Sequence, residues 1–209
     1  MNIDDIKEKI EIPGTRLGII EAIFWKQHEL ANKYIEIEEK NGVGYGLVSK
    51  GYIDINDVKS QSLIKDFAWR VTEELTEAIE AYDNKQEEHM LEEIADAFHF
   101  MVELCIITNI TPKLVATIDP LGPQPLSPKP KRRAYSVIHE LGLAMNCLKQ
   151  KPWKQTHVLT DSKKFTVHLI TAFLKMCELW LSLGGTAETL YVYYFKKNKV
   201  NQFRIESQY

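Results

Sequence analysis

Apolar residues recur every three to four positions along most of this chain, which is the spacing of one buried face of an α-helix. The chain therefore predicts an all-α fold, a helical bundle interrupted by a Pro-rich connector and continued by a smaller helical lobe. The predicted helices cover approximately residues 16–40, 57–83, 87–109, 134–150, 161–183 and 186–198.

Two acidic blocks lie in the second and third of these helices. Glu74 and Glu77 form the first block, and Glu93 and Asp96 form the second. Residues three apart share one side of a helix, so each block points two carboxylates in one direction. The second block is unusual because the run from Ile94 to Ile107 is apolar except at positions 96, 99 and 103, which indicates a helix buried on nearly every side.

An antiparallel hairpin across the polar segment 84–86 would bring these four carboxylates together. Buried carboxylates cost several kcal/mol, on the order of the penalty for unpaired ions, unless a cation compensates them. Oxygen ligands favour a hard ion such as Mg²⁺. The alternative is that Glu74 and Glu77 lie on an ordinary solvated face, as we expect for Glu73 and Glu80, but this alternative does not explain an acid inside an apolar helix.

Local signals mark where the helices begin and end. Asp57, Asp161 and Thr186 occupy positions typical of N-caps or helix starts. The glycines of segment 42–46 lack the lysine and hydroxyl residue of a phosphate-binding P-loop, so this segment is predicted to be a flexible turn. Six of the eight prolines lie in segment 111–133, which is predicted to be an extended connector without regular helix. The basic cluster 129–133 that ends it reads either as a solvated linker end or as a phosphate-attracting patch.

Composition and charge exclude several classes of protein. A net charge of −3 gives no reason to expect binding to nucleic acid or to a membrane surface. The three cysteines, at positions 105, 147 and 177, lie in apolar helical sequence without metal-type spacing and are predicted to be buried thiols in a reducing compartment. Neither a signal peptide nor a membrane-spanning run is apparent, so we expect a cytoplasmic protein.

The last stretch of the chain carries a second candidate constellation. Lys197, Asn198, Asn201 and Arg204 fall within two to three helical turns, and all four side chains are donors suited to phosphate oxygens. An acidic metal site and a donor-rich segment are complementary halves of a nucleotide triphosphate site. The alternative is a frayed basic tail. We expect the segment after Lys196 to bind substrate rather than to stabilise the fold.

These motifs together resemble one protein family. The pattern Glu74-x-x-Glu77 followed by Glu93-x-x-Asp96-x-x-His99 is similar to the ExxE…ExxD pattern of the all-α NTP pyrophosphatase superfamily. The C-terminal pattern Tyr194-x-x-Lys-Asn-x-x-Asn-x-Phe-Arg204, ending at Tyr209, resembles the signature of the dimeric dUTPases and the related phage dCTP/dUTP pyrophosphatases. The segment 148–153 also resembles a motif in the mobile lobe of longer members.

The resemblance implies a function and a role for each matching residue. It implies that Glu74, Glu77, Glu93 and Asp96 hold two or more Mg²⁺ ions, with Mn²⁺ able to substitute, and that Glu74 or Glu77 is the general base. It implies cleavage between the α- and β-phosphates, releasing a nucleoside monophosphate and pyrophosphate. The residues implied to surround the base and sugar are Gln27, Asn32, His99, Phe100 and Trp153. Those implied to meet the phosphates are Lys197, Asn198, Asn201, Arg204 and Tyr209.

The resemblance also implies a homodimer and one pyrophosphatase domain over residues 1–209. Within it we expect metal-binding helices at 15–110, the connector at 111–133, a helical lobe at 134–185 and a phosphate-binding segment at 186–209. For a phage-encoded member the location is the host cytoplasm. The chain departs from the family in two places: Asn32 lies one position late relative to the first motif, and Gln208 replaces the glycine before the terminal tyrosine.

Alternative functions remain open at this stage. dUTP is the expected substrate, with dUDP or dCTP as further substrates, while a dCTP-preferring or other dNTP pyrophosphatase of the same superfamily is the alternative. A di-iron carboxylate bundle is a remote alternative, because Asp96 and His99 form only one of the two acid–histidine pairs that it needs. A non-enzymatic helical adaptor is the third hypothesis.

Overall fold

The computed structural model describes residues 10–41, 52–124, 126, 129–151, 153 and 155–207. Throughout these ranges every regular element is an α-helix, so the predicted all-α fold is confirmed. The helices are α2 (Arg16–Lys40), α3 (Val58–Asp83), α4 (Glu87–Ile107), α5 (Pro112–Val115), α6 (Pro130–Cys147), α7 (Ser162–Ser182) and α8 (Ala187–Glu206).

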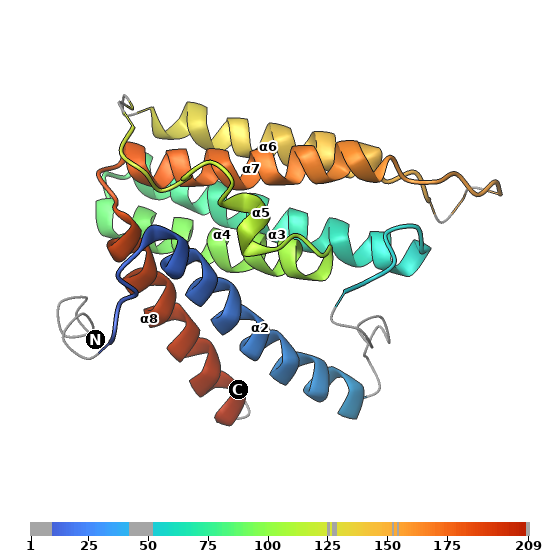
Figure 1. The fold of residues 1–209 in the computed structure, drawn as a ribbon, viewed down its shortest axis with the longest axis horizontal. Coiled ribbons are helices and arrows are strands. Elements are labelled where there is room, and N and C mark those ends of the chain that lie inside the picture. Colours follow the sequence, from blue (N-terminus) through green and yellow to red (C-terminus); the bar gives the residue numbers. More distant parts are fainter. Residues whose placement is uncertain are drawn as a thin grey trace.

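The helices pack mainly as three pairs (Figure 1). The predicted hairpin of α3 and α4 is confirmed and forms the middle pair. The pair of α6 and α7 lies on one side of it, while α2 and α8 lie on the other side and run at an angle to the rest. The short helix α5 contacts both α2 and α7. Because α4 contacts α2, α3, α7 and α8, it is the central helix of the bundle.

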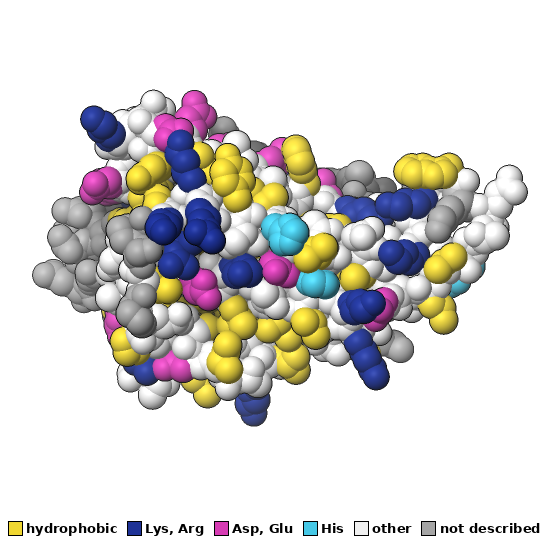
Figure 2. Space-filling model, turned by 90° about the horizontal axis from the view of Figure 1, so that it is seen from above, with side chains coloured by type: hydrophobic (Ala, Val, Ile, Leu, Met, Phe, Trp, Pro, Cys, Tyr) yellow, Lys and Arg dark blue, Asp and Glu magenta, His cyan; other side chains and the backbone are white. Residues whose placement is uncertain are grey.

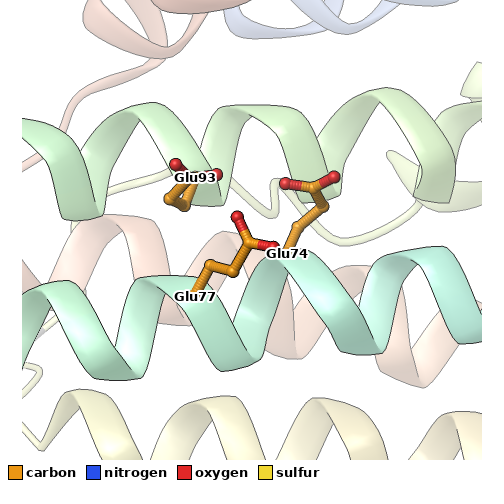
Figure 3. A group of neighbouring side chains, drawn as sticks. All are labelled: Glu74, Glu77 and Glu93. Carbon is orange, nitrogen blue, oxygen red and sulfur yellow. The ribbon is translucent and has the colours of Figure 1, made fainter.

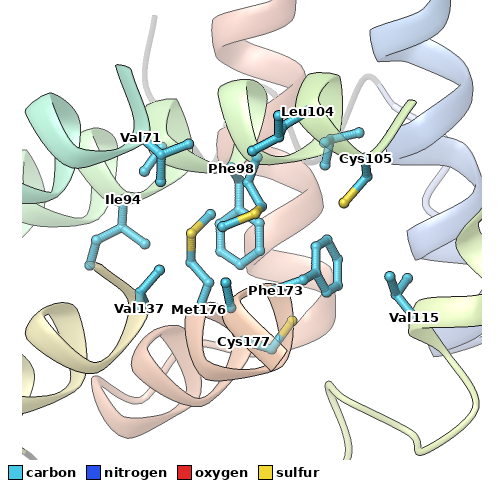
Figure 4. Packing of buried hydrophobic residues seen from close by; sticks show 14 of the residues in the cluster. Val71, Ile94, Phe98, Leu104, Cys105, Val115, Val137, Phe173, Met176 and Cys177 are labelled. Atoms are coloured by element: carbon cyan, nitrogen blue, oxygen red, sulfur yellow. The ribbon is translucent and has the colours of Figure 1, made fainter. Parts of the chain in front are cut away.

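The apolar core is built from every layer of the bundle. Figure 4 shows buried side chains of five helices converging. Examples from α3, α4, α5, α6 and α7, in that order, are Val71, Phe98, Val115, Val137 and Phe173. The rings of Phe98 and Phe173 meet edge to face with centroids 6.1 Å apart, a favourable aromatic geometry. Cys105, Cys147 and Cys177 are buried free thiols, as the apolar sequence around them predicted.

Local hydrogen bonds explain where the helices begin and end. The side chains of Asp57 and Asp161 accept from the backbone amides of Ser60 and Lys164, which confirms both predicted N-caps. Three helices end in a Schellman motif, in which a residue with positive φ closes the last turn: Lys85 (φ 58°), Asn109 (φ 61°) and Gly184 (φ 81°). The first of these motifs turns the chain between α3 and α4.

The expectation that residues 111–133 form no regular helix is wrong at both ends. Pro112 begins α5 and Pro130 begins α6, four residues before the predicted start. Proline is tolerated at the first helical position because the amide hydrogen that it lacks would have no helical partner there. Residues 131–133 therefore lie in the opening turns of α6, where Lys131 pairs with Asp83 and Arg133 with Glu178.

A basic surface results from this early helix start. Figure 2 looks onto α6 and α7 from above and shows Lys and Arg side chains gathered over one end of that face. Lys129, Arg132, Arg133 and Lys175 line a hollow of about 340 Å³ there, with Glu178 at its edge.

The last helix is longer than predicted. It begins after the capping box of Thr186 and Thr189 and runs to Glu206 rather than ending near Asn198. No Gly or Pro occurs in residues 187–206, so nothing in the local sequence interrupts the helix. The predicted glycine-rich turn 42–46 and Tyr209 lie outside the residues that the structure describes.

One helix has the length and composition of a membrane span. It is α7, Ser162–Ser182. Phe165, Leu169, Met176 and Trp180 of this helix are nevertheless buried against the rest of the protein, as in a central core helix. Its apolar character is therefore explained by packing in the bundle.

Gly185 provides a test of this packing. A Cβ atom at Gly185 would lie 2.3 Å from Nε1 of Trp180, a buried ring that donates a hydrogen bond to the Thr186 carbonyl at 2.9 Å. We expect Gly185→Ala to lower the free energy of unfolding by about 1–3 kcal/mol, the usual cost of overpacking, in urea denaturation. Gly142→Ala, where a Cβ would meet nothing within 4 Å, is the control and should raise it by about 0.5–1 kcal/mol. Equal denaturation midpoints for the two variants would contradict this account.

Candidate active site

Three carboxylates meet between α3 and α4. One oxygen atom from each of Glu74, Glu77 and Glu93 lies within 4.8 Å of the others (Figure 3). The antiparallel hairpin produces this arrangement because Glu74 and Glu77 share one side of α3 and Glu93 lies opposite them on α4. The sequence placed four carboxylates here, and the structure brings these three together.

Burial and neighbouring carboxylates disfavour the charged forms of two groups in and beside this cluster. The pKa of Glu74 is raised to about 8, first by burial and then by its hydrogen bond with Glu93 and the charge of Asp96. The pKa of Asp96 is raised to about 6 because burial outweighs the stabilising hydrogen bond and charge of Lys197. Glu77 is exposed. The unfavourable effect of burial on a charged carboxylate therefore acts on Glu74 and Asp96, whose pKa values are raised.

Asp96 lies one turn beyond Glu93 and faces α8. Its Oδ2 accepts a hydrogen bond from the ammonium group of Lys197, and the neighbouring Lys196 donates to Glu92 Oε1 at 2.5 Å. These two ion pairs border a cavity of about 220 Å³ between α4 and α8. The charged and polar residues that line it are His89, Glu92, Glu93, Asp96, Tyr193, Lys196 and Lys197. Of the acidic and basic halves predicted from sequence, Glu93, Asp96 and Lys197 line this cavity.

The clustered ligands fit a hard divalent cation. All three donors are carboxylate oxygens, the type that Mg²⁺ and Mn²⁺ prefer over softer metals. Burial, and then the neighbouring carboxylates, raise the pKa of Glu74, so its charged form is disfavoured where it stands. A divalent cation held by Glu74, Glu77 and Glu93 would supply the missing positive charge, and Asp96 is the adjacent further ligand.

His99 and Gln27 lie in a buried network with Tyr194 and Glu103. Gln27 Nε2 donates to Glu103 Oε2 at 2.8 Å, and the hydroxyl of Tyr194 donates to Gln27 Oε1 at 2.6 Å. His99 Nδ1 lies 2.8 Å from the same Gln27 oxygen, and His99 Nε2 lies 3.1 Å from the Tyr194 carbonyl oxygen. The His99 ring stacks on the Tyr194 ring at 3.7 Å. The network joins α2, α4 and α8 one turn from the Asp96–Lys197 pair.

The C-terminal donors divide between two sides of α8. Lys197, Asn201 and Arg204 recur at intervals of four and three residues and so share one side. The positive charges of Arg204 and Lys197 both lower the pKa of Tyr34, although burial raises it more, so this tyrosine of α2 lies near that side. Asn198 is fully buried instead and donates to the Lys26 carbonyl at 3.3 Å. The expectation that this segment only binds substrate is therefore incomplete, because Asn198 also anchors α8 to α2.

The remaining predicted site residues are not part of the carboxylate cluster. Asn32 is exposed and pairs with His28 on its own helix, while Phe100 packs against Phe67 with ring centroids 6.4 Å apart. Trp153 is 78% exposed. Three residues earlier, the Gln150 carbonyl accepts a hydrogen bond from Lys65 of α3. Lys65 and Glu74 are separated by about 14 Å along the helix axis at the usual rise per residue.

The sequence analysis missed three candidate functional residues, which are Lys196, Glu92 and Glu103. Lys196 and its partner Glu92 line the cavity next to the predicted pair of Lys197 and Asp96. Glu103 accepts a hydrogen bond from Gln27. The occurrence of an acidic residue in an otherwise apolar run was the sequence signal that could have identified it. A buried carboxylate in such a run requires a partner, but the sequence could not identify the partner 76 residues away.

The strain at Glu74 predicts how stability depends on pH without metal. A carboxyl group whose pKa rises from 4.5 to about 8 on folding stabilises the protein below pH 4.5, and this contribution is lost as the pH rises through about 8. We expect this effect in the presence of a chelator that removes divalent metal. As the pH rises from about 5 to about 9, the melting temperature of Glu74→Gln should fall less than that of the unaltered protein. Glu80→Gln, an exposed position on the same helix, is the control and should follow the unaltered protein. Parallel curves for all three proteins would contradict the assigned strain.

Comparison with known proteins identifies the family. A family model described as dUTPase matches residues 74–209, more than half of the chain, and the match includes both acidic blocks and the C-terminal motif. The curated proteins and the solved structures that were compared contain no match to this chain. dUTPases of this type bind a nucleotide and generally use a divalent metal, which agrees with the acidic cluster. The chain therefore belongs to the all-α dimeric dUTPase family and is a nucleotide pyrophosphohydrolase.

Proposed function

We propose that this protein hydrolyses dUTP to dUMP and pyrophosphate with Mg²⁺. The observation that carries the proposal is the meeting of carboxylates and lysines at one cavity in a chain of the dUTPase family. A triphosphate needs cationic partners along its oxygens, and the attacking water needs a base beside the phosphorus. The cavity between α4 and α8 offers the cationic partners, and Glu93, which lines it, joins it to the carboxylate cluster that contains Glu74.

The acidic residues have separate roles in this proposal. Glu74, Glu77, Glu93 and Asp96 hold the Mg²⁺ ions, which when bound supply positive charge to the phosphate oxygens and activate water. Glu74 is the general base, because it is half-buried and has a raised pKa whereas Glu77 is exposed. His89 Nδ1 lies 3.2 Å from Glu93 Oε1 and orients that ligand.

The donors of α8 bind the phosphates. Lys197 reaches the cavity through its ion pair with Asp96, and Asn201 and Arg204 continue the same side of the helix. Tyr209, which lies outside the described residues, is assigned to the phosphates as well. Asn198 contributes by fixing the helix on α2, since both polar atoms of its side chain are bonded within the protein.

The base and sugar are assigned to Gln27, Asn32, His99, Phe100 and Trp153. Gln27 and His99 lie in the buried network that joins α2, α4 and α8. Asn32 and Trp153 are exposed and lie apart from the cavity, so their contacts would come from a second subunit of the homodimer or from rearrangement of the turn around Trp153. Cytoplasmic location, with no nucleic-acid or membrane partner, completes the proposal.

The arrangement of His99 argues against the di-iron alternative. That alternative needs the imidazole to ligate a metal beside Asp96. Both ring nitrogens of His99 instead face Gln27 and the Tyr194 carbonyl, inside the protein. Among the described residues, the group of possible ligands consists of carboxylates alone.

Removing a metal ligand tests the acidic site. We expect Glu93→Gln and Asp96→Asn each to lower kcat/KM for dUTP by at least about a hundredfold, because a metal ligand or a transition-state group is lost. Glu73→Gln is the matched control on α3. Glu73 is bonded to Trp69 and Arg70 rather than to the cluster, so its variant should retain nearly full activity. Near-normal turnover by either ligand variant would refute the assignment.

A substrate panel tests the choice of base. Uracil and cytosine exchange a donor and an acceptor on one edge, and a site that pairs one edge rejects the other when its buried groups are left unpaired. We expect pyrophosphate release with Mg²⁺ to be fastest on dUTP, slower on dCTP and dUDP, and poor on purine triphosphates. Fastest release from dATP or dGTP would overturn the proposal, whereas dCTP above dUTP would retain the mechanism and change the preferred substrate.

A further inference from the structure

Two residues with separate roles in the proposed reaction are bonded to each other in the structure. Lys197 of α8 donates a hydrogen bond to Oδ2 of Asp96 on α4, and the two side chains form an ion pair. The proposed function gives Asp96 to the metal and Lys197 to the phosphates. One contact therefore links the metal-binding half of the site to the phosphate-binding half.

This ion pair is partly enclosed by the protein. The side chain of Asp96 is 12% exposed and that of Lys197 is 31% exposed. The hydrogen bond and the charge of Lys197 both lower the pKa of Asp96, although burial raises it more. A partly buried pair is screened by salt and water much less than a surface pair. Lys197 therefore supplies positive charge to a carboxylate that needs a cation in order to stay ionised.

Asp96 is close to the carboxylate cluster but is not a member of it. The group of oxygens that lie within 4.8 Å of one another comes from Glu74, Glu77 and Glu93. The charge of Asp96 nevertheless raises the pKa of Glu74, so the two groups lie within electrostatic range of each other. The fourth carboxylate predicted from sequence is thus next to the cluster and bonded to a lysine.

A divalent cation and an ammonium group compete for the same carboxylate. Like charges a few Å apart repel strongly where water is partly excluded, so ligation of a metal by Asp96 favours the departure of Lys197. A lysine side chain has a flexible four-carbon stem, and its ammonium group can leave without movement of the helix. The neighbouring ion pair of Lys196 with Glu92 continues to hold α8 against α4. Phosphate oxygens offer the released ammonium a new anionic partner.

We infer that Lys197 is the counter-cation of Asp96 when no metal is bound, and that it leaves Asp96 for a substrate phosphate when Asp96 becomes a metal ligand. This inference rests on the proposed function and adds an energetic link between its two ligands. With metal alone, Lys197 loses its anionic partner, and with phosphate alone, Asp96 loses its cationic partner. Each ligand therefore strengthens the binding of the other, because the exchange then leaves both residues paired.

Metal affinity tests one half of the exchange without any assay of activity. Electron paramagnetic resonance of Mn²⁺ measures the affinity of the nucleotide-free protein after its metal has been stripped. We expect Lys197→Met to tighten Mn²⁺ binding by about tenfold, the scale on which groups beside metal ligands act, because Asp96 then has no competing ammonium. Lys197→Arg keeps a cation for Asp96 and should bind Mn²⁺ as the unaltered protein does.

A charge-matched control separates this competition from a general change in charge. Lys196→Met removes the same charge from the same cavity but leaves the pair of Lys197 with Asp96 in place, so it should change Mn²⁺ binding much less. Equal tightening in Lys196→Met and Lys197→Met would overturn the inference. Weaker Mn²⁺ binding in Lys197→Met would overturn it as well, since Lys197 would then assist the metal site.

Pyrophosphate binding tests the other half. Titration calorimetry with inorganic pyrophosphate on metal-stripped protein reports how well the lysine reaches phosphate oxygens. We expect Asp96→Asn to tighten pyrophosphate binding by about tenfold, the worth of one charge-assisted hydrogen bond, because Lys197 is released from its partner. The gain should disappear when Asp96→Asn is combined with Lys197→Met. A gain that persists in this double variant, or no gain in Asp96→Asn, would contradict the exchange.

These measurements and the substrate panel fail separately. If the unaltered protein hydrolyses dUTP and neither variant binds its ligand more tightly, the exchange is wrong and the proposed function stands. If both gains appear and dUTP is not hydrolysed, the substrate assignment is wrong and the exchange applies to another phosphate ligand. Absence of Mn²⁺ binding from the unaltered protein and from Lys197→Met alike would overturn both.

Discussion

The structure depends on polar groups that are carried by a helix buried on all sides. α4 presents Glu93, Asp96, His99 and Glu103 at intervals of three, three and four residues, so they form one stripe along it. Burial of each group is costly unless a partner compensates it, and each partner comes from another helix. Glu93 meets α3, Asp96 meets α8, His99 meets both α2 and α8, and Glu103 meets α2. These pairings fix how three helices lie against α4.

The two ends of this stripe differ in how their charges are satisfied. At the Glu103 end, hydrogen bonds within the protein join Glu103, Gln27 and Tyr194. At the Glu93 end, burial and neighbouring carboxylates raise the pKa of Glu74 and Asp96, so negative charge remains in excess. The first end stabilises the fold, and the second is held in a strained state that a divalent cation relieves.

The sequence predicted the features that local chemistry determines. Helical spacing, the caps at Asp57 and Asp161, and the hairpin of the acidic blocks follow from residues close together in the chain. The prolines of residues 111–133 were expected to prevent helix formation, and this was wrong for two of them. Pro112 and Pro130 occupy the first helical position, where proline is tolerated. The partners of buried groups were beyond the sequence. Gln27 and His99 are 72 residues apart, and many polar residues could have served either one.

The last helix shows why binding and folding cannot be assigned to separate segments here. Tyr194 and Asn198 of α8 are fully buried and bond to Gln27 and the Lys26 carbonyl of α2. Lys197 lies between them in sequence but points to Asp96, because neighbouring positions project in different directions around a helix. The packing of the buried side therefore fixes where α8 lies along its axis and how it is rotated about that axis. This in turn fixes where the donors on the other side are placed. For the proposed phosphate binding, core packing fixes the backbone that carries the donors before any phosphate arrives, which reduces the entropy that substrate binding must overcome.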